Sequence, residues 1–258
     1  MRVRKLDQPR GWSFVFGASI LKPLLFLTTK PRWVDGEKLP TTGGYVMVVN
    51  HVSHLDPLTT AHFVYDHGRL PRYLAKSALF RNRFLGFFLR AAGQIPVARQ
   101  TTDAAGAYDA AVAAVRSGEC LVVYPEGTLT RDPDLWPMTG KTGAARIALE
   151  TGCPVIPVAQ WGVQHMLAPY AKRPHLLPRH EVVHKVGDPV DLSDLTSTPP
   201  SVADIKTATE RIMAAITDLL AEIRGEEAPA ERFDPRQHGV SQIGNPRKQR
   251  SDEGRSEQ

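Results

Sequence analysis

Short runs of β-forming residues alternate with stretches of helical periodicity through most of this 258-residue chain. The strand candidates are residues 45–49, 72–75, 94–97, 121–124, 155–159 and 182–186, and the helix candidates are residues 57–67, 79–92, 102–117, 141–151 and 202–224. Alternation of this kind is typical of an α/β fold in which helices connect parallel strands. The sequence therefore predicts a single-domain αβ sandwich with a largely parallel central sheet, formed by residues 33–224.

The positive charge of the chain is concentrated at its N-terminus. The net charge is +5, with 32 Lys and Arg against 27 Asp and Glu. Residues 1–32 alone carry +6, residues 225–258 carry −1, and the residues between them are neutral. A nucleic-acid-binding domain needs a basic stripe across its body, whereas basic charge beside an apolar run suits an anionic membrane surface. The charge distribution thus favours a membrane surface as partner and gives no support to nucleic acid.

Two terminal segments flank the predicted domain. Residues 12–27 are almost entirely apolar, but the run is short for a membrane-spanning helix, Lys22-Pro23 interrupts it, and no signal-peptide cleavage site follows. Because apolar residues surround the helical axis, we expect residues 1–32 to be a membrane-associating segment with a helix break at Pro23; core packing and a signal anchor are the alternatives. Residues 225–258 are polar and mixed in charge, and are expected to form a disordered tail.

A cluster of polar residues follows the first predicted strand directly. The apolar run at 46–49 leads into Asn50, His51, Ser53 and Asp56. Ligands bind at the carboxyl ends of strands in α/β sheets. Pro57 favours a helix that begins near Asp56, and this arrangement would let the carboxylate reach an imidazole on the preceding loop. His51 is then a candidate general base and Asp56 the group that orients it.

Two other interpretations of this cluster compete with catalysis. Asp56 alone can cap the helix that follows, and His51 can be an ordinary loop histidine. His51, His54 and Asp56 are also possible metal ligands, but their spacing does not match a His-x-His-x-Asp-His site, so no metal is expected. The chain has only Cys120 and Cys153, which excludes a disulfide scaffold and a four-cysteine zinc site.

The helix predicted at 79–92 has an unusually wide apolar face. Its few polar residues other than Arg81 fall within one arc, and phenylalanines and leucines cover the rest of its circumference. An interfacial helix, or a wall for an acyl chain, needs such a face; core packing is the alternative.

Four blocks of the sequence, taken in order, resemble the motifs of one enzyme family. Asn-His-x-Ser-x-x-Asp at 50–56, the block 93–99 that ends in Arg, Pro-Glu-Gly-Thr at 125–128 and the proline-paired strand 153–158 are similar to the four motifs of the glycerolipid acyltransferases, including the PlsC-like lysophosphatidic acid acyltransferases. A Lys-x-Gly at 141–143 also matches. The resemblance covers roughly residues 33–190.

The resemblance implies an αβ fold and assigns roles to individual residues. His51 and Asp56 are implied to be catalytic, Glu126 and Thr128 to orient the acceptor, and the backbone N–H of Gly127 to face a developing oxyanion. The implied substrate-binding residues together are Asn50, Ser53, Arg99, Glu126, Gly127, Thr128 and Lys141. Arg99 and Lys141 are the implied ligands of a phosphate group.

The implied reaction transfers a fatty acyl group from acyl-CoA or acyl carrier protein to 1-acylglycerol 3-phosphate, without a cofactor, at the cytoplasmic face of the cell membrane. One position departs from the family pattern: Leu129 stands where family members usually have an Arg that helps to hold the acceptor's phosphate, and Arg131 comes two places later. Another lysophospholipid or a glycolipid is therefore an alternative acceptor. A thioester or ester hydrolase and a non-catalytic membrane-binding module remain the alternatives from other classes.

Overall fold

The computed structural model describes residues 4–5, 11–97, 103–195 and 197–241. In these residues the strands are β1 (Thr29–Val34), β2 (Tyr45–Val49), β3 (Pro71–Lys76), β4 (Ile95–Val97), β5 (Cys120–Val123), β6 (Val155–Trp161) and β7 (His180–Val186). The helices are α1 (Trp12–Thr28), α2 (Asp56–Asp66), α3 (Arg83–Ala91), α4 (Asp103–Arg116), α5 (Gly143–Thr151), α6 (Val163–Met166) and α7 (Val202–Arg224), with short 3-10 turns η1 (Gly36–Lys38) and η2 (Ser77–Arg81).

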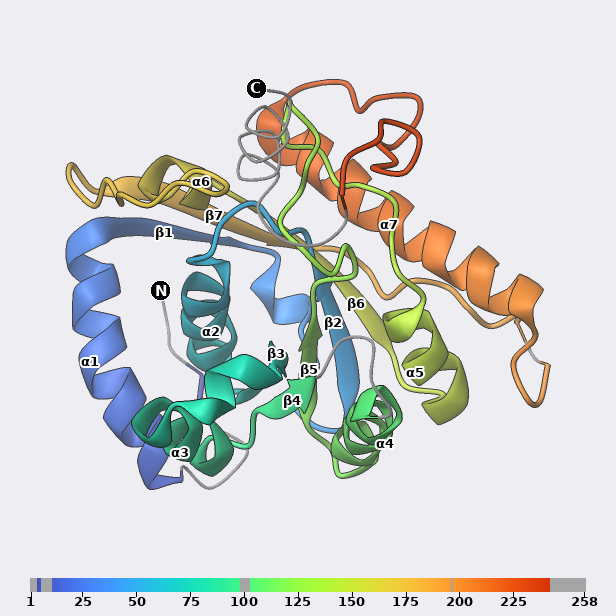
Figure 1. The fold of residues 1–258 in the computed structure, drawn as a ribbon, viewed down its shortest axis with the longest axis horizontal. Helices are drawn as coiled ribbons and strands as arrows, with labels where there is room; N and C mark the ends of the chain where they lie inside the picture. The colour runs from blue at the N-terminus through green and yellow to red at the C-terminus, as the bar shows by residue number, and fades with distance from the viewer. Residues whose placement is uncertain (1–3, 6–10, 98–102, 196, 242–258) are drawn as a thin grey trace, which may run out of the picture.

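The strands form one sheet in the order β1-β7-β6-β2-β5-β3-β4 (Figure 1). Every neighbouring pair is parallel except β6 and β7. Strand β2 lies centrally, with Val46 opposite Leu121 on β5 and Val155 on β6. The αβ fold with a largely parallel sheet is therefore confirmed, and all six predicted strands are present.

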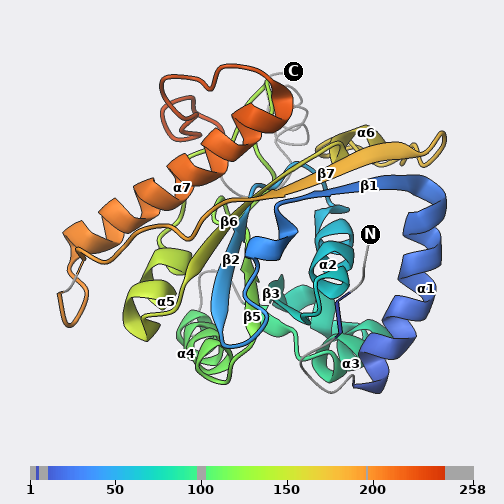
Figure 2. The same ribbon diagram turned by 180° about the vertical axis from the view of Figure 1, so that it is seen from behind.

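Helices pack on both faces of the sheet (Figures 1 and 2), and an apolar cluster lies on each face. Val46 and Val48 point to the layer made with α4, α5 and α7. Tyr45, Met47 and Val49 point the other way and pack with Phe63 and other residues of α2. Because all five residues of β2 are buried, the strand is a continuous apolar run without polar alternation.

Strand β1 was not predicted. It pairs only with β7, so it lies at one edge of the sheet. Its sequence contains Lys30, Pro31 and Arg32, and Pro is tolerated in strands mainly at such edges. An edge strand needs fewer buried apolar residues than a central one, which explains why its pattern gave no strand signal.

The break expected at Pro23 is not found: α1 continues through it to Thr28. Contacts along the helix offset the backbone hydrogen bond that proline cannot make. Near its start, the ring of Phe16 packs against Phe88 of α3, with 5.9 Å between centroids. One residue before Pro23, Lys22 Nζ lies 2.7 Å from Asp66 Oδ1 at the end of α2.

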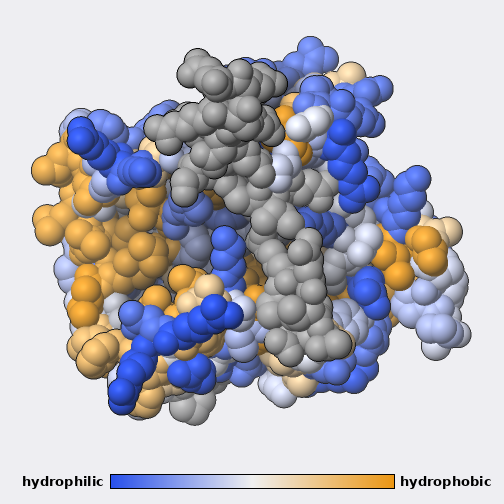
Figure 3. All heavy atoms as spheres, in the orientation of Figure 1, coloured by the Kyte–Doolittle hydropathy of each residue, from blue (hydrophilic) through white to orange (hydrophobic). Residues whose placement is uncertain are grey.

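Helices α1 and α3 leave large apolar side chains exposed, which Figure 3 shows as a cluster on one side of the molecule. Phe16, Ile20 and Phe26 of α1 are each more than half exposed. On α3, Phe84 is 90% exposed and Phe87 61% exposed. Core packing is thus the wrong interpretation for these side chains. No helix in the described part of the chain is long and apolar enough to span a membrane.

The expected C-terminal tail has a described first part. Residues 225–241 form no helix or strand, but Thr139 N–H donates to Phe233 O at 3.1 Å and Pro235 is buried. The remainder of the expected tail, residues 242–258, lies outside the described residues.

Arg69 anchors the sheet near the amino ends of β2 and β5, opposite to the strand ends that carry the polar cluster. Its guanidinium is almost fully buried and donates to Pro40 O, Gly43 O and Gly118 O at 3.2, 2.7 and 2.6 Å. We expect Arg69→Met to lower the free energy of unfolding by roughly 2–4 kcal/mol, because buried carbonyls lose their donor. Urea denaturation measures this loss, and Arg69→Lys should recover only part of it. A wild-type denaturation midpoint for Arg69→Met would show that these bonds contribute little.

Candidate functional site

The loop after β2 is shaped by a side chain from β6. Asn50 is buried; its Nδ2 donates to Gln160 O at 3.0 Å, and its Oδ1 accepts from Gln160 N–H at 2.8 Å. Gln160 Nε2 donates back to Asn50 O at 2.8 Å. Ser53, also buried, donates through Oγ to Leu167 O at 2.7 Å. The structure therefore places Asn50 and Ser53 as residues that fix the loop, with their polar groups directed at protein atoms.

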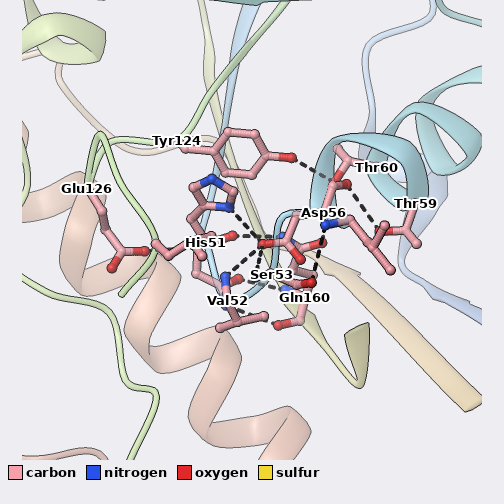
Figure 4. Close-up of polar contacts among 12 residues, drawn as sticks. His51, Val52, Ser53, Asp56, Thr59, Thr60, Tyr124, Glu126 and Gln160 are labelled. Carbon is pink, nitrogen blue, oxygen red and sulfur yellow. Dashed lines mark hydrogen bonds and ion pairs between the residues drawn. The ribbon is translucent and has the colours of Figure 1, made fainter. Parts of the chain in front are cut away.

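His51 and Asp56 contact each other at the end of this loop (Figure 4). His51 Nδ1 lies 2.8 Å from Asp56 Oδ2, and the same oxygen accepts the N–H groups of Val52 and Ser53 at 2.7 and 2.8 Å. Asp56 is the first residue of α2, as its sequence position before Pro57 predicted. A carboxylate oxygen that already accepts two N–H groups acts as acceptor to the imidazole as well, which places the proton on Nδ1 and leaves the lone pair on Nε2.

The environment of Asp56 differs from that of its partner. Asp56 is fully buried, whereas the side chain of His51 is 15% exposed. Burial raises the pKa of Asp56, and the hydrogen bonds from His51 and the two backbone N–H groups oppose that shift. The pair thus joins a buried acceptor to a ring that reaches solvent, as a solvent-facing general base requires.

Tyr124, a residue that was not among the predicted site residues, packs on the ring of His51. The two ring centroids are 4.3 Å apart and the planes are inclined by 23°. The Tyr124 hydroxyl donates to Thr60 Oγ1 at 3.2 Å, and Thr60 lies one helical turn after Asp56 on α2. The signal available in the sequence was the place of Tyr124 at the end of the predicted strand 121–124. In the structure this strand, β5, pairs with β2.

Glu126 supports the same loop from the other side. Its Oε1 accepts His51 N–H at 2.8 Å, and its Oε2 accepts Met138 N–H at 3.1 Å. Burial raises the pKa of Glu126 to about 8, against the effect of these hydrogen bonds. Both carboxyl oxygens of Glu126 therefore accept hydrogen bonds from the protein backbone. One bond is to His51, and the other is to Met138 in the segment that leads to α5.

The backbone N–H of Gly127 does not take the role that the resemblance implied. It donates to Tyr124 O at 2.9 Å and so closes a turn after β5. Gly127 has a φ of +70°, and a Cβ there would lie 2.9 Å from Lys141 Cδ and 3.2 Å from Lys141 Nζ. A glycine at this position thus provides the turn and lets Lys141 approach the backbone closely.

Lys141 and Thr128 border a small hollow, open to solvent, next to this turn. Among the described residues, its lining is Glu126, Thr128, Met138, Thr139, Gly140, Lys141, Pro235 and Arg236. Leu129, at the position where the family usually has Arg, is buried, as is Arg131, whose guanidinium lies over the ring of Tyr170. The predicted phosphate ligand Arg99 lies outside the described residues.

Within the described ranges, no group of three His, Cys, Asp or Glu side chains could hold a metal ion. His54, the third metal candidate of the loop, packs edge-on to Tyr170 with 6.3 Å between ring centroids.

Two known proteins with sequences similar to this chain are acyltransferases by name. A 1-acyl-sn-glycerol-3-phosphate acyltransferase of Bacillus subtilis (strain 168) is 26% identical to this chain over 209 residues. The alignment covers 80% of this chain and 96% of that protein. A protein of the same name from Borreliella burgdorferi is 30% identical over 155 residues, 59% of this chain and 60% of that protein.

The fold also resembles a solved structure. The crystal structure of the 1-acyl-sn-glycerophosphate (LPA) acyltransferase PlsC from Thermotoga maritima superimposes with a TM-score of 0.62 at 21% identity, and the match covers 81% of this chain and 82% of that one. The profile of the family described as Acyltransferase matches residues 31–161, just over half of the chain, and this segment contains β2, the His51–Asp56 pair and the Glu126 loop. The chain therefore belongs to the acyltransferase family.

Proposed function

We propose that this enzyme transfers a fatty acyl group from an acyl thioester to the free hydroxyl of 1-acylglycerol 3-phosphate, giving phosphatidic acid. The observation that carries the proposal is the contact between His51 Nδ1 and Asp56 Oδ2 at 2.8 Å; Glu126, which accepts the His51 N–H, also lines the hollow bordered by Lys141. Such a pair activates a hydroxyl, and a cation beside it suits an acceptor that carries a phosphate. The names of the relatives from Bacillus subtilis and Borreliella burgdorferi point to the same acceptor.

The proposed reaction is direct acyl transfer. Nε2 of His51 takes the proton of the acceptor hydroxyl while the oxygen attacks the thioester carbonyl. The tetrahedral intermediate then expels the thiolate, which takes the proton from the imidazolium. The buried carboxylate of Asp56 stabilises the imidazolium between these two proton transfers. An acyl thioester is already activated, so no covalent enzyme intermediate and no cofactor are needed; the donor is acyl-CoA or acyl carrier protein.

A different lysophospholipid or a glycolipid is the second candidate acceptor. The buried Leu129 supports it, because the family usually has a phosphate-holding Arg there. Initial rates with one labelled acyl-CoA and a panel of acceptors, presented in anionic vesicles, test the assignment. The fastest turnover should be with 1-acylglycerol 3-phosphate. Loss of thioester at the same rate without any acceptor would instead identify a hydrolase.

We further propose that the enzyme works at the cytoplasmic face of an anionic membrane. The exposed apolar side chains of α1 and α3 lie side by side, with Trp12 and Phe87 ring centroids 5.6 Å apart. Residues 1–32 carry a net charge of +6. Apolar area and positive charge together stabilise a peripheral or monotopic association with anionic lipid.

Replacement of His51 tests the general base. His51→Ala should lower kcat by at least 10²–10⁴-fold, on the order that general-base catalysis contributes, because no group then takes the hydroxyl proton. The matched control is His54→Ala, which removes a nearby imidazole that packs edge-on to Tyr170, whereas His51 holds the hydrogen bond to Asp56. Initial-rate kinetics together with circular dichroism measure both variants. Near-normal kcat in His51→Ala would contradict the mechanism.

The raised pKa of Glu126 predicts a pH dependence of stability. Burial raises this pKa from 4.5 to about 8, so the folded state holds the proton more tightly than the unfolded state. The contribution of Glu126 to the free energy of unfolding is therefore fully present below pH 4.5 and is lost as the pH rises through about 8. Glu126→Gln cannot titrate, so the wild type should lose stability relative to this variant between pH 5 and pH 9. Urea denaturation at several pH values measures the difference, with Glu222→Gln as an exposed control. Parallel profiles of wild type and Glu126→Gln would refute the shift.

The exposed phenylalanines of α3 test the membrane contact. The double variant Phe84→Ser, Phe87→Ser should weaken partitioning to anionic vesicles about tenfold or more, because each ring gives up burial in lipid. Val202→Ser is the control, since Val202 is 86% exposed but lies at the start of α7, far from α1 (Figure 1). Vesicle co-sedimentation measures partitioning. Equal partitioning of the double variant and the wild type would exclude α3 from the contact.

A further inference from the structure

The segment that follows α7 is fixed against the loop between β5 and α5. Thr139 N–H donates to Phe233 O at 3.1 Å, and the guanidinium of Arg232 pairs with Glu210 on α7. Pro235 is buried, and the ring of Phe233 stacks on His238 with 4.3 Å between centroids. Figure 1 shows this segment, in red, folded back at the same end of the molecule as the loop that follows β5. Its path is therefore set by contacts with the catalytic domain.

This path brings Arg236 to the same hollow as Lys141. The turn that presents Arg236 is closed by two hydrogen bonds to Asp234: Arg236 N–H donates to its Oδ1 at 2.9 Å and Gln237 N–H to its backbone O at 3.1 Å. Glu126, which holds the backbone of His51, lines the hollow as well. The hollow thus shares Glu126 with the loop that carries the catalytic imidazole.

The charges around the hollow favour an anion. Arg236 and Lys141 contribute two positive charges to its lining, and Glu126 contributes the carboxyl group. Burial raises the pKa of that carboxyl to about 8, so near neutral pH its proton removes most of the repulsion toward an anion.

We infer that Arg236 and Lys141 together bind the phosphate of the acceptor, so that the segment after α7 completes the substrate site. The inference rests on the proposed function, and it identifies a cation to replace the arginine that the family usually has at the position of Leu129. That leucine is 2% exposed and Arg131 is 9% exposed, so neither presents a cation to the hollow surface. A guanidinium binds a phosphate through two parallel hydrogen bonds, which an ammonium cannot do.

The test compares phosphorylated and neutral acceptors with the full-length enzyme. Arg236→Gln should raise KM for 1-acylglycerol 3-phosphate roughly 10- to 100-fold, as expected for loss of a charge-assisted contact, with kcat changed less than about twofold. KM for a monoacylglycerol, which has no phosphate, should stay within about twofold. Arg236→Lys should restore part of the loss, because it returns the charge without the fork. Lys206→Gln, which removes an exposed charge from α7, is the matched control.

A binding measurement separates failure of the inference from failure of the proposed function. Calorimetry with glycerol 3-phosphate should show binding to the wild type and to Lys206→Gln, and at least tenfold weaker binding to Arg236→Gln. This readout requires no turnover, so it supports or refutes the phosphate site even if the wild type acylates another acceptor. Equal affinity of wild type and Arg236→Gln for glycerol 3-phosphate, or an unchanged KM for the phosphorylated acceptor, would overturn the inference.

Discussion

The site is organised by one buried oxygen, Asp56 Oδ2, which accepts hydrogen bonds from the His51 ring and from two backbone N–H groups of the same loop. These bonds fix the loop, start α2 and set the tautomer of the imidazole at once. A fully buried carboxylate needs such donors, and all three of these act on Oδ2, so the loop has little freedom to adopt another shape. On the other side of the loop, Glu126 holds the backbone N–H of His51, so the position of the ring depends on two buried carboxyl groups.

Polar contacts between the strands support this arrangement from behind. Asn50 and Gln160 exchange three hydrogen bonds, which join the ends of β2 and β6. Thr60 donates to Gln160 Oε1 at 3.3 Å and accepts from the Tyr124 hydroxyl. Tyr124 thereby connects this network to the face of the His51 ring. The network lies beneath the imidazole, so a change in it alters where the ring lies while leaving the reacting groups themselves intact.

The sequence predicted the parts of the site that depend on local patterns. The apolar run of β2 ending at a polar cluster placed His51 at the sheet edge, and Asp56-Pro57 marked the start of α2. Directions of side chains and N–H groups were not predictable in this way. Whether Asn50 faces β6, and whether the N–H of Gly127 faces a substrate or Tyr124 O, depends on how distant segments meet. The docking of residues 233–235 on the domain was not predicted, because a polar composition does not show where such a segment packs.

The ion pair between Lys22 and Asp66 has a mechanical consequence. Hydrogen bonds from His62 and Lys22, although opposed by burial, lower the pKa of Asp66 to about 2, so this carboxylate keeps its charge at physiological pH. Asp66 ends α2 and Asp56 begins it, so one helix of 11 residues, about 16 Å long, lies between the ion pair with α1 and the carboxylate that contacts His51. With α1 on a bilayer, as proposed, α2 would hold the His51–Asp56 pair at a set distance from the lipid head groups.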